Sequence, residues 1–308
     1  MEGFLPKQIK SVSLQNVFVI IRKNMSTQRF IISLLAALLL MTPGRKGFAA
    51  ETTVHTITNW PNSTVDIWHG YQRYHFTVDG CQAWVVVPKT NSPGQRWSWC
   101  MEFPDAFTKR CATLQLLEAG YYSAHITVGN TFGCPKAIAQ CNDFYQRLTA
   151  QGLNVQPVLI GISRGGLYAY HWAAANPSRV GAIYGDAPVC DIKSWPGGKG
   201  QGKGSTNDWT QLIANYGFQN EAAALAYTNN PIEILAPLAK AGIPLIHVVG
   251  DSDDVVPVAE NTAIMEKRYR ALGGQIQVIH KPGIGHHPHG LDDPEPVVQF
   301  ILKNNLAR

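Results

Sequence analysis

Short apolar runs alternate with segments of helical periodicity along most of the chain after residue 71. The first two runs, 71–78 and 81–87, are separated by Asp79-Gly80, a pair typical of a tight hairpin turn, and they predict two antiparallel strands. Further on, apolar runs of four to eight residues alternate with longer amphipathic segments. This alternation predicts an α/β fold with a mainly parallel sheet and helices on both faces, because parallel strands need crossover connections.

The expected elements follow one another in a regular order that one long segment interrupts. Strands are expected at 71–78, 81–87, 96–103, 122–128, 155–162, 180–184, 244–249 and 276–279, and helices at 106–119, 135–150, 164–175, 232–241, 259–272 and 294–304. The segment from about 187 to 230, after the sixth expected strand, shows no clear periodicity. We expect it to form an irregular cap beside the carboxyl edge of the sheet.

Ser163 lies where one of these strands turns into a helix. The sequence around it is Gly161-Ile162-Ser163-Arg164-Gly165, a Gly-x-Ser-x-Gly turn that places a serine at the apex between a strand and a helix. The glycines leave room for the tight backbone, and the N–H groups of the helix N-terminus favour developing negative charge. These features suit acyl transfer to the serine.

A serine hydroxyl becomes a good nucleophile when a base takes its proton and a carboxylate orients that base. Both partners are available downstream, because Asp253 follows the apolar run 244–249 and His286 follows the run 276–279. Other residues remain alternatives for each role, including one acid after an earlier strand. They are Asp254, Asp251 or Asp186 for the acid, and His287 or His289 for the base.

The same His-His-x-His run, beside Asp292 and Asp293, is also a candidate zinc site. Adjacent histidines seldom converge on one ion, and a catalytic histidine accounts for the run without a metal. We therefore expect no metal and no cofactor.

These motifs resemble those of serine hydrolases with the α/β-hydrolase fold, near the secreted esterase and prolyl-oligopeptidase-like branch, over about residues 71–302. In that family the acid lies in Gly-x-x-Asp-x-x-Val-Pro and the base follows Gly-x-Gly, which His286 does here. The residues that match the acid motif are Gly250, Asp253, Val256 and Pro257. The order serine, acid, histidine is also usual for the fold. The resemblance implies a catalytic triad of Ser163, Asp253 and His286.

An oxyanion hole is expected from two backbone N–H groups, that of Arg164 after the nucleophile and that of Phe103 after an earlier strand. Pro104 has no N–H, which favours Phe103 as the second donor. Glu102 is expected to contact substrate or to hold this loop. The Ser-Arg pair is also similar to the Gly-x-Ser-Arg-x-Gly of glucuronoyl esterases, which implies that Arg164 reaches the oxyanion or a sugar carboxylate.

The expected cap contains a Gly- and Lys-rich loop with Trp195 and Trp209 close to it. Tryptophan rings in a cap would stack on a sugar or an aryl group of the substrate, and the alternative is that they are structural residues of a solvated loop.

The N-terminal part has the layout of a secretory signal peptide. A basic start at Arg29 precedes the apolar run 30–41, and small residues follow at Ala49 and Ala50. The apolar run of twelve residues is shorter than the ~20 that span a bilayer. Whether translation starts at Met1 or Met25 stays open.

Removing this leader changes the charge of the chain. The 308 residues carry a formal net charge of +5, but 50–308 hold only 19 of the 26 basic side chains and 20 of the 21 acidic ones. The mature domain thus has no basic excess that would favour a nucleic-acid partner. All six cysteines also lie in it, and an even number in an exported chain predicts disulfides, with free buried thiols as the alternative.

Taken together, these features predict a signal peptide with an upstream extension at 1–49 and an α/β-hydrolase domain at 50–308. We expect a secreted or periplasmic carboxylic ester hydrolase with a Ser-His-Asp triad, acting on a carbohydrate or small polar ester. A prolyl-type serine peptidase is the first alternative. A non-catalytic binding protein that retains the fold is the second.

Overall fold

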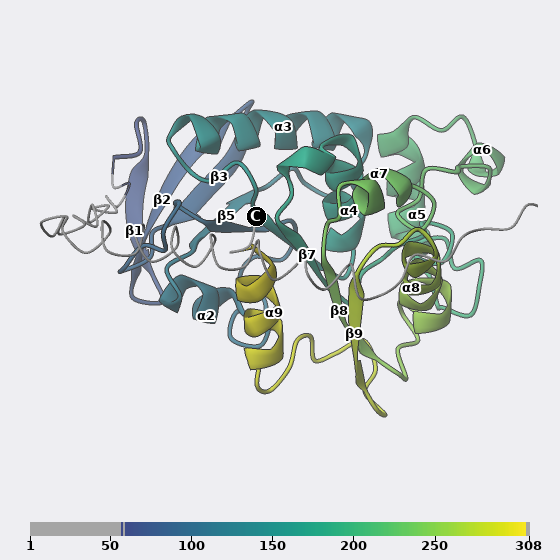
Figure 1. Ribbon diagram of the computed structural model, residues 1–308. Coiled ribbons are helices and arrows are strands. Elements are labelled where there is room, and N and C mark those ends of the chain that lie inside the picture. The colour runs from purple at the N-terminus through teal and green to yellow at the C-terminus, as the bar shows by residue number, and fades with distance from the viewer. Residues whose placement is uncertain (1–56, 58, 306–308) are drawn as a thin grey trace, which may run out of the picture. The chain divides into compact units, whose positions relative to one another are not determined.

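A nine-stranded sheet forms the centre of the domain, in the order β1-β2-β3-β5-β4-β6-β7-β8-β9 (Figure 1). The strands are β1 (Thr64–Trp68), β2 (Tyr71–Val78), β3 (Cys81–Val86), β4 (Trp97–Cys100), β5 (Tyr122–Ile126), β6 (Val158–Ile162), β7 (Ala182–Asp186), β8 (Leu245–Gly250) and β9 (Ile276–Lys281). The pairs β1·β2, β2·β3 and β3·β5 are antiparallel, and the remaining pairs are parallel. The predicted α/β class is confirmed, including its antiparallel start.

The computed structural model describes residues 57 and 59–305, which all belong to one unit of the chain. The predicted signal peptide and its cleavage site near Ala49 lie outside the described residues, so export stays a prediction. No helix within the described part combines the length and the apolar character needed to cross a bilayer.

Helices cover both faces of the sheet. They are α2 (Thr113–Glu118), α3 (Pro135–Ala150), α4 (Gly165–Ala175), α5 (Thr206–Tyr216), α6 (Glu221–Leu225), α7 (Ala236–Lys240), α8 (Thr262–Ala271) and α9 (Glu295–Asn305), with 3-10 turns η1 (Pro177–Arg179) and η2 (Val258–Glu260). Figure 1 shows α3 and α4 on one side of the sheet and α2 and α9 on the other.

Alternation along the central strands divides their apolar side chains between the two largest of three buried clusters. In β6, Leu159 belongs to the core beneath α3 and α4, whereas Ile160 and Ile162 belong to the core beneath α2 and α9. Successive side chains of a strand point to opposite faces, so a fully apolar strand such as β6 fits a sheet that is covered on both sides. This double burial holds the carboxyl end of β6, where Ser163 follows, in a fixed position.

The expected helix at 106–119 is shorter in the structure, where only α2 (Thr113–Glu118) is helical. Two further features also differ from the expected elements. The strand β1 is absent from the expected elements. It is an edge strand whose Val65 and Ile67 are 57% and 69% exposed, so its apolar residues do not mark a buried face. Backbone pairing with β2, rather than burial, holds it in place. The segment 187–230 is not wholly irregular, since it contains α5 and α6. Local signals account for α5: the Ser205 side chain caps its start and Gly217 ends it in the left-handed conformation.

All six cysteines are free thiols in the structure: Cys81, Cys100, Cys111, Cys134, Cys141 and Cys190. Five of them are buried, which agrees with the alternative of buried thiols rather than with the predicted disulfides.

Candidate active site

Ser163 occupies a strained turn between β6 and α4. Its φ of 51° lies in the left-handed region that non-glycine residues rarely adopt. Two backbone contacts hold it there: its N–H donates to the Asp186 carbonyl at 2.8 Å, and its carbonyl accepts from the Val189 N–H at 2.9 Å. A Cβ at Gly166 would lie 2.7 Å from the Val189 carbonyl oxygen, so the turn packs against the segment after β7 with no space for a side chain there.

Ser163, His286 and Asp253 form a continuous hydrogen-bonded chain. Ser163 Oγ lies 2.9 Å from His286 Nε2, and His286 Nδ1 lies 2.7 Å from Asp253 Oδ2. The other carboxylate oxygen of Asp253 accepts the N–H groups of Val255 at 2.9 Å and Val256 at 2.8 Å. Only 8% of the histidine side chain and 1% of the aspartate side chain are exposed. The sheet topology creates this meeting, because the three residues follow the carboxyl ends of the parallel strands β6, β9 and β8.

The alternative acids have other partners. Asp251 pairs with His280 at 2.6 Å, and Asp254 pairs with Lys203 at 2.5 Å. The hydrogen bond from Lys203 lowers the pKa of the Asp254 carboxyl. Neither of these residues pairs with His286.

Asp186, the third alternative acid, forms a second buried acid–histidine pair next to the first. Its Oδ1 lies 2.7 Å from His289 Nδ1, while its Oδ2 accepts the Gly290 N–H at 2.8 Å and the Tyr184 hydroxyl at 2.6 Å. The pair is almost completely buried, with 4% of the histidine and none of the aspartate side chain exposed. Sequence reasoning named both residues only as substitutes within a single triad and missed that they pair with each other.

The loop that follows β4 lies against the nucleophile turn. Phe103 has a φ of 55° and lines the same pocket as Ser163. Burial raises the pKa of the Glu102 carboxyl, and the Arg164 guanidinium, 3.4 Å away, opposes this rise. The same guanidinium donates to Asn130 Oδ1 at 2.7 Å and lies 4.8 Å from the centre of the Phe103 ring.

The two parts of Arg164 therefore differ in what they contact. The guanidinium is held by Glu102, Asn130 and the Phe103 ring, so it supports the loop. That it also reaches the oxyanion or a sugar carboxylate, as the glucuronoyl esterase likeness implied, stays a prediction. The backbone N–H of Arg164 has no acceptor among the described residues. An N–H in this position is available to an oxyanion.

The pocket at Ser163 is small and mostly apolar, with a cavity of about 240 Å³. Its lining consists of Phe103, Ala106, Phe107, Ile162, Ser163, His286, His287 and His289. Neither cap tryptophan predicted to bind substrate is part of this lining. Trp209 is only 7% exposed and donates to Glu221, and the Trp195 ring packs on Phe132 with 6.2 Å between ring centres. Both rings pack against the hydrophobic core, which agrees with the structural alternative.

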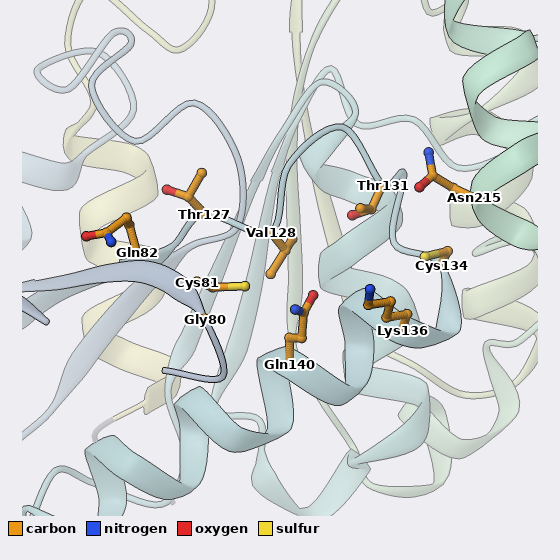
Figure 2. A pocket seen from close by; sticks show the side chains of 10 residues that line it. All are labelled: Gly80, Cys81, Gln82, Thr127, Val128, Thr131, Cys134, Lys136, Gln140 and Asn215. Atoms are coloured by element: carbon orange, nitrogen blue, oxygen red, sulfur yellow. The ribbon is translucent and has the colours of Figure 1, made fainter. Parts of the chain in front are cut away.

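A second and more polar pocket of about 410 Å³ opens beside the start of β3 and the N-terminal part of α3 (Figure 2). Lys136 and Gln140 project into it from α3, Cys81 and Gln82 come from β3, and Asn215 comes from α5. Its lining includes neither a member of the Ser163 chain nor an acid–histidine pair. Of these two pockets, only the one at Ser163 is therefore lined by members of the hydrogen-bonded chain and of the acid–histidine pairs.

Comparison by sequence identifies no relatives. No protein-family model matches the chain. No curated protein matches it either.

Comparison by structure finds many solved structures with the same arrangement of elements. A dipeptidyl peptidase 4 from Porphyromonas gingivalis aligns over 76% of this chain and 35% of its own, with 14% identity and a TM-score of 0.53. A puromycin-hydrolyzing peptidase from Mycobacterium tuberculosis aligns over 79% and 40%, with 14% identity and a TM-score of 0.55. An acylaminoacyl peptidase from Pyrococcus horikoshii aligns over 70% and 38%, with 13% identity and a TM-score of 0.53.

The chain thus spans at most 40% of the length of these three proteins, and the identity is low enough that the likeness concerns the fold alone. Its mostly parallel sheet and the helices on both faces agree with that likeness. The chain has the α/β-hydrolase fold, in the form that these serine peptidases share.

Proposed function

We propose that the chain is a serine hydrolase that cleaves an amide or peptide bond through an acyl-enzyme formed on Ser163. The observation that carries this proposal is the hydrogen-bonded chain from Ser163 Oγ through His286 to Asp253, at 2.9 and 2.7 Å. A serine, an imidazole and a buried carboxylate in this order are the groups that nucleophilic acyl transfer requires.

Each group has a defined task in the proposed reaction. Ser163 Oγ attacks the carbonyl carbon while His286 Nε2 takes its proton, and Asp253 keeps the imidazole oriented and stabilises its positive charge. The Arg164 N–H, which has no acceptor among the described residues, holds the tetrahedral oxyanion. The Phe103 N–H, the second predicted donor, must leave the Glu102 carboxylate to join it. His286 then returns the proton to the leaving amine, and a water molecule hydrolyses the acyl-enzyme by the same route.

Two observations support an amide substrate with a small apolar or aromatic acyl part. The structural neighbours are named as peptidases, including one that hydrolyses puromycin. The pocket offers side chains of matching character, since Phe103, Phe107 and Ile162 line it. Burial of an apolar substrate group against these rings would contribute about 25 cal/mol per Å² of apolar surface.

A carboxylic ester hydrolase is the second candidate, and the composition of the pocket favours it. None of the eight lining residues carries a carboxylate, ammonium or guanidinium group that would hold the charged terminus of a peptide. A neutral ester of a small apolar acid fits such a lining. The carbohydrate form of this candidate loses its support, because Trp195 and Trp209 pack elsewhere.

Labelling with a fluorophosphonate probe tests the shared chemistry. Folded wild-type protein is expected to be labelled once per chain, and Ser163→Ala is expected to lose the label. Ser252→Ala is a matched control, because Ser252 is an exposed serine outside the pocket lining and should leave labelling unchanged. Equal labelling of the wild-type protein and Ser163→Ala would refute the proposal.

A substrate panel separates the two candidates. We expect N-acylated and aminoacyl p-nitroanilides with aromatic side chains to be hydrolysed, with a kcat/KM that Ser163→Ala abolishes. Turnover of p-nitrophenyl esters without turnover of any anilide would favour the ester hydrolase and exclude the peptidase.

A further inference from the structure

We propose that His286, His287 and His289 form a binding site for one Zn²⁺ ion, and that the bound ion inhibits the hydrolase by occupying His286 Nε2. The inhibitory effect rests on the proposed function, whereas the binding of the ion does not. The sequence suggested zinc for this run only as an alternative to a triad. The structure shows how one cluster can serve both purposes.

The three imidazoles lie close enough together to be candidates for binding one ion. One ligand nitrogen from each residue lies within 4.8 Å of the others, and the ring centres are 4.7 to 5.0 Å apart. A tetrahedral zinc site with Zn–N distances of 2.0–2.1 Å places its nitrogens about 3.4 Å apart. The nitrogens must therefore approach one another by at most about 1.4 Å. His287 is the exposed member of the three and is held by no carboxylate among the described residues.

Two of the histidines already have the supporting contacts that zinc ligands use. The Nδ1 atoms of His286 and His289 each lie 2.7 Å from a carboxylate oxygen, of Asp253 and Asp186 respectively. Both carboxylates are buried, with 1% and 0% of their side chains exposed. A carboxylate on one imidazole nitrogen fixes the tautomer that presents the other nitrogen to a metal and raises its basicity.

The carboxylates leave the Nε2 atoms of His286 and His289 as the ring nitrogens available to an ion. His286 Nε2 faces Ser163 Oγ at 2.9 Å, and His289 Nε2 has no hydrogen-bond partner in the part of the chain that the structure describes. All three histidines line the 240 Å³ cavity. Phe107 packs beside His287 and His289, with ring centres 6.0 and 5.4 Å apart, and provides an apolar wall around the site.

An ion in this position competes directly with the proposed reaction. The lone pair of His286 Nε2 accepts the Ser163 proton, and a coordinated Zn²⁺ would hold that lone pair. Three neutral imidazoles suit Zn²⁺ and other late transition metals, whereas Mg²⁺ and Ca²⁺ prefer oxygen ligands. Zn²⁺ and other late transition metals should therefore inhibit the protein, whereas Mg²⁺ and Ca²⁺ should not. A chelator should reverse the inhibition.

Direct binding to Ser163→Ala tests the site without any need for activity. Calorimetric titration of this full-length variant with Zn²⁺ should give one ion per chain, and Co²⁺ should show the intense visible absorption of a tetrahedral site. A second substitution in this variant, His287→Asn or His289→Gln, should weaken Zn²⁺ binding at least tenfold. Loss of a group that only supports a ligand already lowers metal affinity by about tenfold or more, and these substitutions remove a ligand itself. His280→Gln, which removes an exposed histidine outside the cluster, is the matched control and should not change binding.

His287→Asn is the decisive variant, because His287 is exposed and its loss breaks no buried ion pair, whereas His289→Gln disrupts the contact with Asp186. Unchanged Zn²⁺ affinity in His287→Asn, or no binding by Ser163→Ala, overturns the inference. In the active protein, Zn²⁺ should suppress fluorophosphonate labelling, Mg²⁺ should not, and EDTA should restore it. Zinc binding without any labelling would refute the hydrolase and leave the metal site, whereas labelling that is insensitive to Zn²⁺ would refute the inhibition.

Discussion

The acid that pairs with His286 is determined by the direction of one side chain among three nearby acids, Asp251, Asp253 and Asp254. Asp253 turns inward because its Oδ1 accepts the N–H groups of Val255 and Val256, which leaves Oδ2 to face His286. Asp254, the next residue, points outward with 59% of its side chain exposed. The two differ by one position in a turn, so composition alone does not separate them.

Asp253→Asn should lower kcat roughly 10³- to 10⁴-fold, because an amide stabilises the wrong imidazole tautomer and gives no charge stabilisation. The matched control is Asp254→Asn, which removes only an exposed ion pair with Lys203 and should change kcat by less than about twofold. Steady-state kinetics on the best substrate of the panel measure both. A larger loss in Asp254→Asn than in Asp253→Asn would contradict this assignment.

At the scale of elements, the nucleophile turn depends on close backbone contact between α4 and the segment after β7. The Gly166 Cα faces the backbone of Val189 and the Pro188 ring, and a Cβ there would lie 2.7 and 2.8 Å from them. The same segment supplies the Val189 N–H that holds the Ser163 carbonyl. Packing between elements thus maintains the positive φ of Ser163.

Gly166→Ala should destabilise the fold by about 1–3 kcal/mol, the usual range for overpacking, and should reduce fluorophosphonate labelling because the turn must shift. Gly285→Ala is the matched control. A Cβ at Gly285 has no neighbour closer than the Ser252 carbonyl oxygen at 3.7 Å, so the fold should tolerate it. Urea denaturation and probe labelling check both variants, and equal stabilities would show that the contact at Gly166 relaxes without cost.

The second buried acid–histidine pair, Asp186 and His289, also connects two elements. Asp186 ends β7, and its carboxylate binds His289 and the Gly290 N–H in the loop that follows β9. His286 belongs to that same loop. This acid–histidine pair therefore fixes the position of His286, the proposed base, relative to the turn that carries Ser163.

At the scale of the whole domain, burial keeps several imidazoles neutral inside the fold. Burial lowers the pKa of His247 to about 3, while its ring nitrogens lie 2.6 Å from the Tyr170 hydroxyl and 2.9 Å from the Thr262 hydroxyl. Burial also lowers the pKa values of His125 and His171. Each of these groups gains a proton more readily in the unfolded chain than in the fold.

Acid should therefore destabilise the protein. Below a pH of about 6.5 His247 gains a proton in the unfolded chain, whereas in the folded chain it stays neutral down to about pH 3. The contribution of His247 to the free energy of unfolding is therefore complete above about pH 6.5 and decreases as the pH falls below that value. Between pH 7 and pH 5 this one residue should contribute a loss of about 2 kcal/mol.

Urea denaturation at several pH values measures this effect. His247→Gln should show a shallower decline of unfolding free energy between pH 7 and pH 5 than the wild-type protein. His280→Gln, which replaces a half-exposed histidine, should show the wild-type decline. The same slope in all three proteins would mean that His247 does not control the acid response.

Local signals in the sequence determined the class of fold and the candidate nucleophile. Strand and helix periodicity, the Gly-x-Ser-x-Gly turn and the downstream order of acid and histidine are all properties of short segments. Backbone conformation follows from such segments directly. The same kind of signal, a capping serine at 205 and a glycine at 217, was also present for α5, which the prediction nevertheless treated as irregular.

Tertiary structure alone decided which side chains meet. It directed Asp253 to His286 and Asp186 to His289, buried Trp209 in the core, and bound the Arg164 guanidinium to Glu102 and Asn130. These contacts join residues far apart in sequence. They form because the packing of the layers buries certain polar groups, and a buried polar group needs a hydrogen-bond partner. The sequence by itself determined the types of groups available, and the packing of the sheet determined how they combine.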